Sequence, residues 1–227
     1  QGPASTGGWG CYNWGGRGGR GGLGAATRRS VALADVPRDV QRAVLAAEDR
    51  DFYEQGGFSP VGIGRAVYNN VSGGAVQGGS TITQQYAKNA YLSSERSFTR
   101  KARELILSVK LEATVGKEEI LEDYLNTIYF GRGAYGVEAA SRAYFGVPVT
   151  ELNYEQGAVL ASLIKAPSFY ADNRKELKAR WRYVIDSMAQ VGWITPQQLD
   201  RASFPQIIKP TNTNRLGGQV GYLLEAV

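Results

Sequence analysis

The chain carries, at residues 43–53, the stretch AVLAAEDRDFY, which sets an acidic residue into an apolar run with helical spacing. If this stretch is a helix, Glu48 lies one turn beyond Val44 and Leu45, on their apolar side. A carboxylate on an apolar face is costly unless it is paired or functional, because burial disfavours its charged form and raises its pKa. Glu48 is therefore a candidate general base, and the alternative is a surface glutamate at a helix end.

A second acidic residue has the same setting at residues 100–107, RKARELIL. On a helix, Glu104 shares a face with Leu107 and Leu111. Two carboxylates on apolar faces of helices indicate acid–base chemistry on a sugar or a similar polyol.

Basic residues surround the second carboxylate. Helical spacing places Arg100 and Lys101 within reach of Glu104, and Arg96 lies one turn earlier. One interpretation is a ladder of surface ion pairs, each worth about 0.3–0.5 kcal/mol. The other is a cationic cluster for a pyrophosphate leaving group, which arginine binds through paired hydrogen bonds. The spacing alone leaves both open.

Between these two stretches, residues 78–89 read GGSTITQQYAKN. Two glycines before a helix leave free backbone N–H groups, which favour an anion. The spacing of a nucleotide P-loop is absent, and a capped polar helix without a ligand is the alternative. The residues that offer the hydrogen-bonding groups needed by sugars and phosphates are Ser80, Thr81, Gln84, Gln85 and Asn89.

The composition excludes several classes of mechanism. The 227 residues include no histidine and one cysteine, Cys11, which rules out a triad with a histidine base and a histidine-ligated zinc site. The net charge of +5 favours an anionic partner, such as a phospholipid surface, a phosphorylated substrate or nucleic acid. No run approaches the roughly 20 apolar residues that span a bilayer. The chain has no initial methionine and ends in an apolar run, so we expect a piece of a longer protein.

The organisation of the chain predicts an all-α protein. We expect a disordered Gly/Arg-rich tail or linker at 1–26, one folded domain at 27–210, and the start of a linker to a further domain at 211–227. Helix caps are expected at Ser80, Ser94, Thr150 and Thr195, the last followed by a proline. The predicted helices span residues 37–53, 60–71, 80–91, 95–115, 117–127, 135–145, 151–165, 173–191 and 196–202.

Four sequence blocks together carry a family resemblance. They are EDRDFYEQGG at 48–57, GGSTITQQ at 78–85, RKARE at 100–104 and KEEILEDYLN at 117–126. In this order they resemble the signature blocks of the peptidoglycan glycosyltransferases, the transglycosylase domain of bifunctional class A penicillin-binding proteins. Several ordered motifs in one chain are far more specific than any one of them.

The resemblance implies a lysozyme-like, two-lobed helical domain at residues 27–210 that polymerises lipid II into glycan strands. The transfer inverts the anomeric carbon and releases undecaprenyl pyrophosphate. By match of position, Glu48 is the general base on the acceptor hydroxyl, and Glu104 assists on the donor side. The resemblance assigns pyrophosphate binding to Lys88, Arg96, Arg100 and Lys101, and substrate contacts to Ser80, Gln84, Gln85 and Asn89.

The resemblance also implies partners and a location. The partners are the growing lipid-linked glycan strand, the membrane surface and a C-terminal transpeptidase domain, at the extracytoplasmic face of the bacterial cell membrane. Mg²⁺ or Mn²⁺ is a reasonable cofactor at the pyrophosphate, and the sequence identifies no ligand for it. We expect no nucleic-acid partner. The apolar residues that could enter the membrane interface, or else pack in the core, are Tyr68, Val71, Tyr91, Leu92 and Phe98.

One residue departs from the family pattern, and two other functions remain open. Gln55 stands where the family usually has histidine, and we expect it to have a structural role because an amide cannot titrate. A lysozyme-like muramidase or lytic glycosidase would also use a glutamate with a raised pKa, but would need no basic cluster. A non-catalytic module that binds an anionic polymer would depend on salt and not on Glu48.

Overall fold

The computed structural model describes residues 29–54, 80–91 and 98–210, and the side chains of residues 91 and 98–102 are not described. Over these ranges the chain is helical, and the strand-like pairing in them is a single bridge between Tyr129 and Tyr135. The all-α prediction is confirmed. Within the same ranges, no helix is long and apolar enough to cross a membrane.

The larger group of helices is built around α7 (Tyr154–Ile164). Helix α7 packs on both α1 (Arg38–Glu48) and α9 (Arg174–Gln190). Gly157 permits the close approach of α1, because a Cβ atom there would lie 2.9 Å from the Cα atom of Val40. This packing fixes the position of α1, whose last residue is Glu48. Around these three lie α6 (Val137–Phe145), α8 (Pro167–Asp172), α10 (Pro196–Arg201) and the 3-10 turns η1 (Leu33–Asp35) and η2 (Val149–Glu151).

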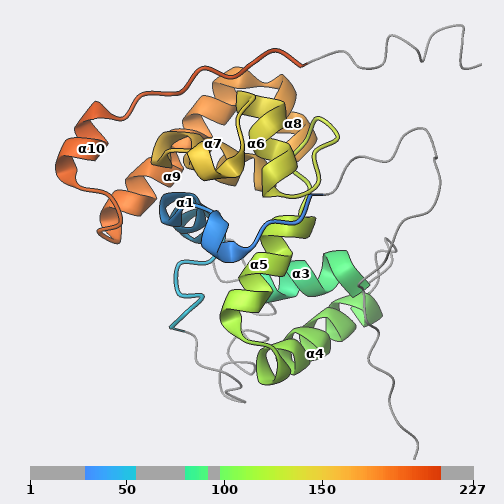
Figure 1. The fold of residues 1–227 in the computed structure, drawn as a ribbon. Coiled ribbons are helices and arrows are strands. Elements are labelled where there is room, and N and C mark those ends of the chain that lie inside the picture. Colours follow the sequence, from blue (N-terminus) through green and yellow to red (C-terminus); the bar gives the residue numbers. More distant parts are fainter. Residues whose placement is uncertain (1–28, 55–79, 92–97, 211–227) are drawn as a thin grey trace, which may run out of the picture.

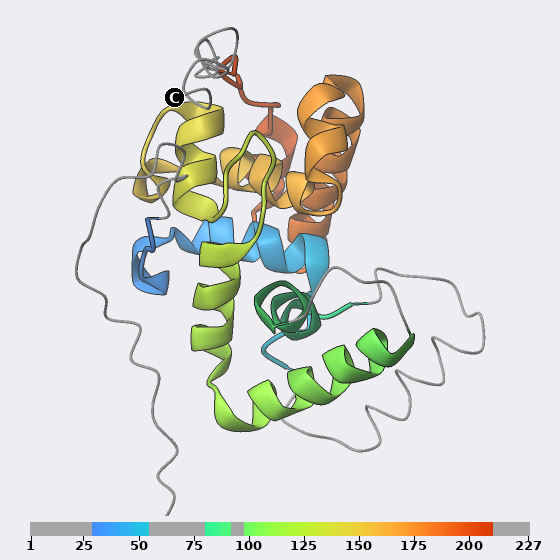
Figure 2. The same cartoon turned by 90° about the vertical axis from the view of Figure 1, so that its right-hand side faces the viewer.

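The smaller group contains α3 (Ile82–Tyr91), α4 (Phe98–Thr114) and α5 (Lys117–Thr127). Helix α3 packs on both α4 and α5. In two views at right angles, α3 lies between α1 above it and α4 below it, and α5 runs from the smaller group toward the larger one (Figures 1 and 2). The helices thus form two groups, and α1 ends where they meet.

The segment before α1 is tied to α5 by side-chain hydrogen bonds. The amide of Asn126 accepts from the backbone N–H of Val31 and donates to its carbonyl, both at 2.9 Å. The carboxylate of Glu122 accepts from the N–H of Leu33 at 2.7 Å. These bonds link the start of the larger group to the smaller one.

Helix ends show where local signals were sufficient. Thr195 and Asn153 each form a capping box, with Gln198 and Gln156 as their partners. The cap expected at Thr195 is confirmed. The cap expected at Thr150 is wrong, because Thr150 lies within η2 and the next helix begins after Asn153.

Two further helix expectations are corrected. Ser80 was expected to cap the helix before Gln84, but the Thr81 hydroxyl accepts the N–H of Gln84 at 3.2 Å and takes that place. The helix expected to continue to residue 53 ends at Glu48, and α8 was not predicted. Other expectations fall outside the described residues: the helix at 60–71, Gln55, Tyr68, Val71, Leu92, the cap at Ser94, the tail at 1–26 and the segment 211–227.

Candidate active site

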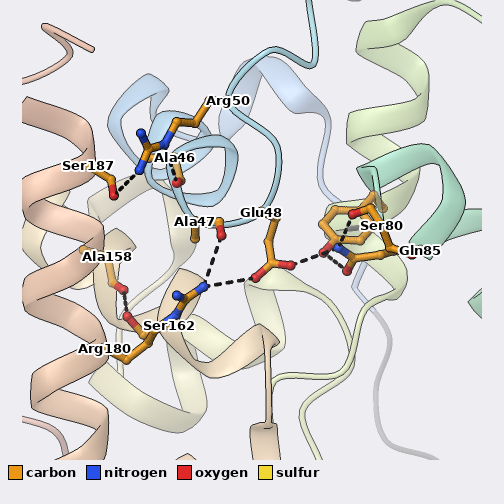
Figure 3. Close-up of polar contacts among 11 residues, drawn as sticks. Ala46, Ala47, Glu48, Arg50, Ser80, Gln85, Ala158, Ser162, Arg180 and Ser187 are labelled. Atoms are coloured by element: carbon orange, nitrogen blue, oxygen red, sulfur yellow. Dashed lines mark hydrogen bonds and ion pairs between the residues drawn. The ribbon is translucent and has the colours of Figure 1, made fainter. Parts of the chain in front are cut away.

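Glu48 occupies the junction between the two groups of helices. Its helix buries Val44 and Leu45 in the core, so the same face carries Glu48 inward and leaves its side chain 12% exposed. The side chain lies between Arg180 of α9 on one side and Gln85 of α3 on the other (Figure 3). The burial predicted for Glu48 from helical periodicity is therefore present.

The two carboxylate oxygens of Glu48 have different surroundings. Oε2 accepts a hydrogen bond of 2.9 Å from the Gln85 amide nitrogen. Oε1 is buried and accepts no hydrogen bond from any residue that the structure describes. Its nearest charge partner is Nη2 of Arg180 at 3.8 Å, a distance too long for a hydrogen bond. One oxygen is thus anchored and the other retains its capacity to accept a proton.

Two arginines hold the end of α1 in place. Nη2 of Arg180 donates to the Ala47 carbonyl at 3.1 Å, and Arg50 donates to Ala46 at 3.5 Å and to Ser187 of α9 at 2.8 Å (Figure 3). These bonds satisfy carbonyl groups that a helix end leaves without partners. Arg180 therefore serves the helix terminus and the Glu48 carboxylate together.

The pKa of Glu48 is raised above its usual 4.5, chiefly because burial removes water from the charged form. The hydrogen bond from Gln85 and the positive charges of Arg180 and Lys165 work in the opposite direction, and the neighbouring Asp49 adds to the increase. Position adds a physical reason, since the negative end of the α1 dipole also disfavours a carboxylate. A carboxylate so placed takes up a proton more readily than an exposed one, as a general base requires.

Gln85 is held from two other directions. Its amide oxygen accepts a 2.9 Å hydrogen bond from the Tyr124 hydroxyl of α5, and its amide nitrogen also donates to the Ser80 carbonyl at 3.3 Å. Burial and the negative charges of Glu48 and Asp49 keep the pKa of Tyr124 well above 10, so the hydroxyl remains a donor. Three helices, α1, α3 and α5, therefore meet in one chain of hydrogen bonds.

Asp49 performs a separate task at the same junction. Its carboxylate accepts the backbone N–H of Ile82, the first residue of α3, at 3.1 Å. An acidic group at a helix N-terminus is favourable because it meets free N–H groups and the positive end of the dipole. Asp49 thus joins the end of α1 to the start of α3. Its own pKa is raised by burial, with the Ile82 N–H opposing that increase.

Glu104, the second carboxylate of the sequence analysis, is buried as its apolar face predicted. It is 2% exposed and shares the inner face of α4 with Ser108 and Leu111. Helix α4 packs on α3, which also supplies Gln85 to Glu48. Helix α3 thus lies beside both elements that carry the two glutamates, bonding Glu48 directly and packing on the helix that bears Glu104.

The remaining predicted substrate contacts are distributed unevenly. Lys88 and Asn89 are exposed near the end of α3. The Ser80 hydroxyl donates to the amide oxygen of Gln84 at 3.3 Å. Arg96 lies outside the described residues, and the positions of Arg100 and Lys101 are known only as backbone at the start of α4.

Three contributors were missed by the sequence analysis: Arg180, Tyr124 and Asp49. Tyr124 lies four residues after Ile120 on a helix, and a buried tyrosine usually needs a partner for its hydroxyl, so a signal was present. Arg180 gave none, because the carbonyl that it binds is 133 residues away.

The fit of a metal ion can be judged from the available ligands. In the part of the chain that the structure describes, no group of three or more Asp, Glu or Cys side chains is placed to hold one. Asp49, the carboxylate next to Glu48 in the chain, already accepts a backbone N–H. The described residues therefore do not form a metal site by themselves.

Known proteins are similar to this chain over most of its length. The family model described as Transglycosylase matches residues 20–189. The chain is 47% identical over 189 residues to penicillin-binding protein 1A of Mycobacterium tuberculosis, which covers 81% of this chain and 23% of that protein. It is 42% identical over 177 residues to penicillin-binding protein 1F of Bacillus subtilis, which covers 75% of this chain and 24% of that protein.

A third relative and a solved structure are also similar to this chain. Penicillin-binding protein 1A of Aquifex aeolicus is 44% identical over 194 residues, which cover 84% of this chain and 27% of that protein. The crystal structure of penicillin-binding protein 1A from Haemophilus influenzae is similar with a TM-score of 0.48 and 25% identity, covering 81% of this chain and 18% of that one. The chain thus spans about a quarter of the length of the curated relatives that it matches.

Proposed function

The chain belongs to the transglycosylase family of glycosyltransferases, and from that premise we propose that it polymerises lipid II into peptidoglycan glycan strands. The observation that carries the proposal is the Glu48 carboxylate at the junction of the two helix groups. One of its oxygens is anchored to Gln85, and the other is buried without a hydrogen bond from the described residues. Burial raises the pKa of this carboxylate, which suits it to receive the proton of an acceptor hydroxyl.

In the proposed reaction, the sugar 4-hydroxyl of one lipid-linked disaccharide attacks the anomeric carbon of the growing chain. A new carbon–oxygen bond forms there as the bond to the pyrophosphate oxygen breaks, and undecaprenyl pyrophosphate leaves with the electron pair. The hydroxyl proton passes to the carboxylate of Glu48. Attack opposite the leaving group converts the α linkage to β.

The other predicted roles belong to the same proposal. Glu104 assists on the donor side, near the anomeric centre or the phosphates. Ser80, Gln84 and Asn89 contact the sugars, and Gln85 acts on the substrate through Glu48, because its amide already bonds that carboxylate. The positive charges proposed to hold the pyrophosphate are those of Lys88, Arg96, Arg100 and Lys101.

The relatives support the proposed setting. Several are named penicillin-binding proteins of types 1A and 1F, and this chain covers only about a quarter of each. We therefore propose a transpeptidase domain elsewhere in the parent protein and a lipid substrate met at the membrane surface, on the extracytoplasmic face. The basic charge of the chain suits an anionic lipid surface and a pyrophosphate.

The test is polymerisation of labelled lipid II in detergent by the parent chain and by Glu48→Gln. Glutamine keeps the size and the acceptor for Gln85 but cannot take up the proton. Long strands from the parent and none from the variant are expected. Equal polymerisation by both would remove Glu48 from the mechanism. Cleavage of preformed strands by the parent, without polymerisation of lipid II, would favour a muramidase.

A further inference from the structure

Two tyrosines form hydrogen bonds across the interface between α3 and α5, in opposite directions. Tyr124 of α5 donates to the amide oxygen of Gln85 at 2.9 Å. Tyr86 of α3 donates to the carboxylate of Asp123 at 2.7 Å. Both rings are buried, at 0% and 8% exposure. Only the bond from Tyr124 continues to Glu48, through the amide nitrogen of Gln85.

The groups around Gln85 fix which way its amide faces. Its nitrogen meets two acceptors, the Glu48 carboxylate at 2.9 Å and the Ser80 carbonyl at 3.3 Å, and its oxygen meets the Tyr124 hydroxyl. A reversed amide would place its oxygen against two acceptors that have no proton to give. It would also lose Tyr124 as a donor to that oxygen. The three partners therefore support one orientation.

We propose that Tyr124 is a positioning residue for glycosyl transfer, which holds the Gln85 amide so that Oε2 of Glu48 stays bound and the carboxylate is kept in one orientation. The inference rests on the proposed function and deepens it. The bond from Gln85 fixes the orientation in which the Glu48 carboxylate takes up the transferred proton. Tyr124 touches no reacting atom in this scheme and acts only through Gln85.

Loss of the Tyr124 hydroxyl should also change the acidity of Glu48. Among the described residues, the charged groups that act on the pKa of Glu48 are Arg180 from α9, Lys165 at the end of α7 and the adjacent Asp49. The titratable hydroxyl of Tyr124 from α5 faces it through Gln85, and its own pKa is raised by the Glu48 charge. Among the described residues, Gln85 is the neutral group that lowers the pKa of Glu48. Without the Tyr124 hydroxyl, the amide is less well held and its bond to Oε2 weakens. The pKa of Glu48 then rises. As the pH is lowered, Glu48 is therefore protonated earlier, and the rate of transfer begins to fall at a higher pH than in the parent.

The experiment compares Tyr124→Phe with Tyr86→Phe, which removes a similar bond from the same interface. We measure kcat, KM and the pH profile of lipid II polymerisation, with thermal unfolding of each variant. For Tyr124→Phe we expect kcat to fall about fivefold, the order of one weakened hydrogen bond, with KM unchanged and the acidic limb moved to higher pH. Tyr86→Phe should lose stability and keep the profile of the parent.

Two further measurements separate the inference from the function on which it rests. In chain labelled with [¹³C]glutamate, the Glu48 carboxyl signal is identified by its loss in Glu48→Gln and titrated by NMR without substrate. Tyr124→Phe should raise that pKa, and should have no further effect on it in a Gln85→Met background. An unshifted Glu48 titration, an equal shift in Tyr86→Phe, or a full second shift in the Gln85→Met background would overturn the role of Tyr124. A parent chain that makes no strands would overturn the proposed function. The NMR titration would still decide whether Tyr124 controls the pKa of Glu48 through Gln85.

Discussion

Two glutamates whose side chains are largely shielded from solvent, Glu48 at 12% and Glu138 at 7% exposure, differ in how their oxygens are used. Glu138 lies in the first turn of α6, and the whole residue is 5% exposed. Its Oε1 accepts from Arg142 at 2.6 Å, and its Oε2 accepts the backbone N–H of Val149 at 2.8 Å. Glu48 ends α1, with one oxygen bound to Gln85 and the other without a hydrogen bond from the described residues. Both oxygens of Glu138 thus accept a hydrogen bond, whereas only one oxygen of Glu48 accepts one from the described residues.

Helix position increases the contrast. Glu138 lies in the first turn of α6, where the positive end of the helix dipole stabilises a carboxylate, whereas Glu48 lies at the last residue of α1, where the negative end opposes it. The ion pairs differ as well: Arg142 makes a direct charged hydrogen bond, while Arg180 remains 3.8 Å from Glu48. Glu138 is therefore arranged to hold η2 against α6, whereas Glu48 keeps one oxygen without a hydrogen bond from the described residues, as the proposed general base requires.

The largest expected effect is on the rate of transfer. Glu48→Gln should lower kcat for lipid II polymerisation by about 10²- to 10⁴-fold, the usual worth of a general base. Glu138→Gln should retain nearly the rate of the parent at temperatures where it stays folded. Initial rates at 25 °C, with circular dichroism to establish folding, make the comparison. A comparable loss of rate in both variants would mean that burial alone, and not the uncommitted oxygen, makes Glu48 important.

Stability should show the reverse order. Glu138→Gln should lower the free energy of unfolding by about 1–3 kcal/mol, because bonds to a charged group in the core are weakened. Glu48→Gln should instead be more stable than the parent at pH 7. The folded state raises the pKa of Glu48, so its ionisation opposes folding at neutral pH. Urea unfolding of the two variants and the parent measures both differences.

The higher stability expected for Glu48→Gln can be tested by its dependence on pH. As the pH falls through the folded-state pKa of Glu48, the parent takes up the proton and the penalty decreases. It is absent below about 4.5, the value for an unperturbed glutamate. The advantage of Glu48→Gln should therefore be fully present above the folded-state pKa and vanish in acid. A variant less stable than the parent at pH 7 would contradict the raised pKa.

Local sequence was sufficient for most of the fold, and tertiary contacts account for its errors. Nearly every helix in the described ranges was expected, because apolar spacing and caps are local signals. The helix predicted through residue 53 stops at Glu48, where Asp49 takes up an extended backbone and bonds the N–H of Ile82, 33 residues away. No pattern within residues 43–53 encodes that partner. The short helix α8 was missed although proline at its start is a usual signal.

In the candidate site, too, local sequence predicted some features, and contacts between distant residues account for the rest. Periodicity alone indicated the burial of Glu48 and Glu104. The polar block was expected to line the substrate, but Gln85 has its amide engaged by Glu48, Ser80 and Tyr124. Arg180 could not be assigned, since a basic residue on a charged helix surface gives no sign of which distant carbonyl it will reach. The chemistry of single residues could thus be predicted from the sequence, but the contacts between residues of different helices could not.

The arginine partners of the two glutamates provide a smaller contrast. Arg180→Gln removes a positive charge beside Glu48, so the pKa of Glu48 should rise further and the acidic limb of polymerisation should move to higher pH. At pH 7 we expect a loss of about 3- to 10-fold in rate, which corresponds to a charge pair near the protein surface. Arg142→Gln removes a partner that is 47% exposed and should leave the pH profile unchanged. A shift of the profile in both variants would point to a general effect of net charge.

The smallest effect is expected at Lys165, whose exposed charge also lowers the pKa of Glu48 but does so less than that of Arg180. Lys165→Met should raise the pKa of Glu48 slightly, as measured by carboxyl NMR titration at low ionic strength. In about 1 M salt, where the screening length is near 3 Å, this rise should disappear because the lysine is reached by solvent. The larger rise in Arg180→Gln should persist, since Arg180 is 15% exposed and lies against the carboxylate. Equal sensitivity of the two shifts to salt would mean that Arg180 acts on Glu48 through solvent, and that the ion pair at the end of α1 contributes no more than a distant surface charge.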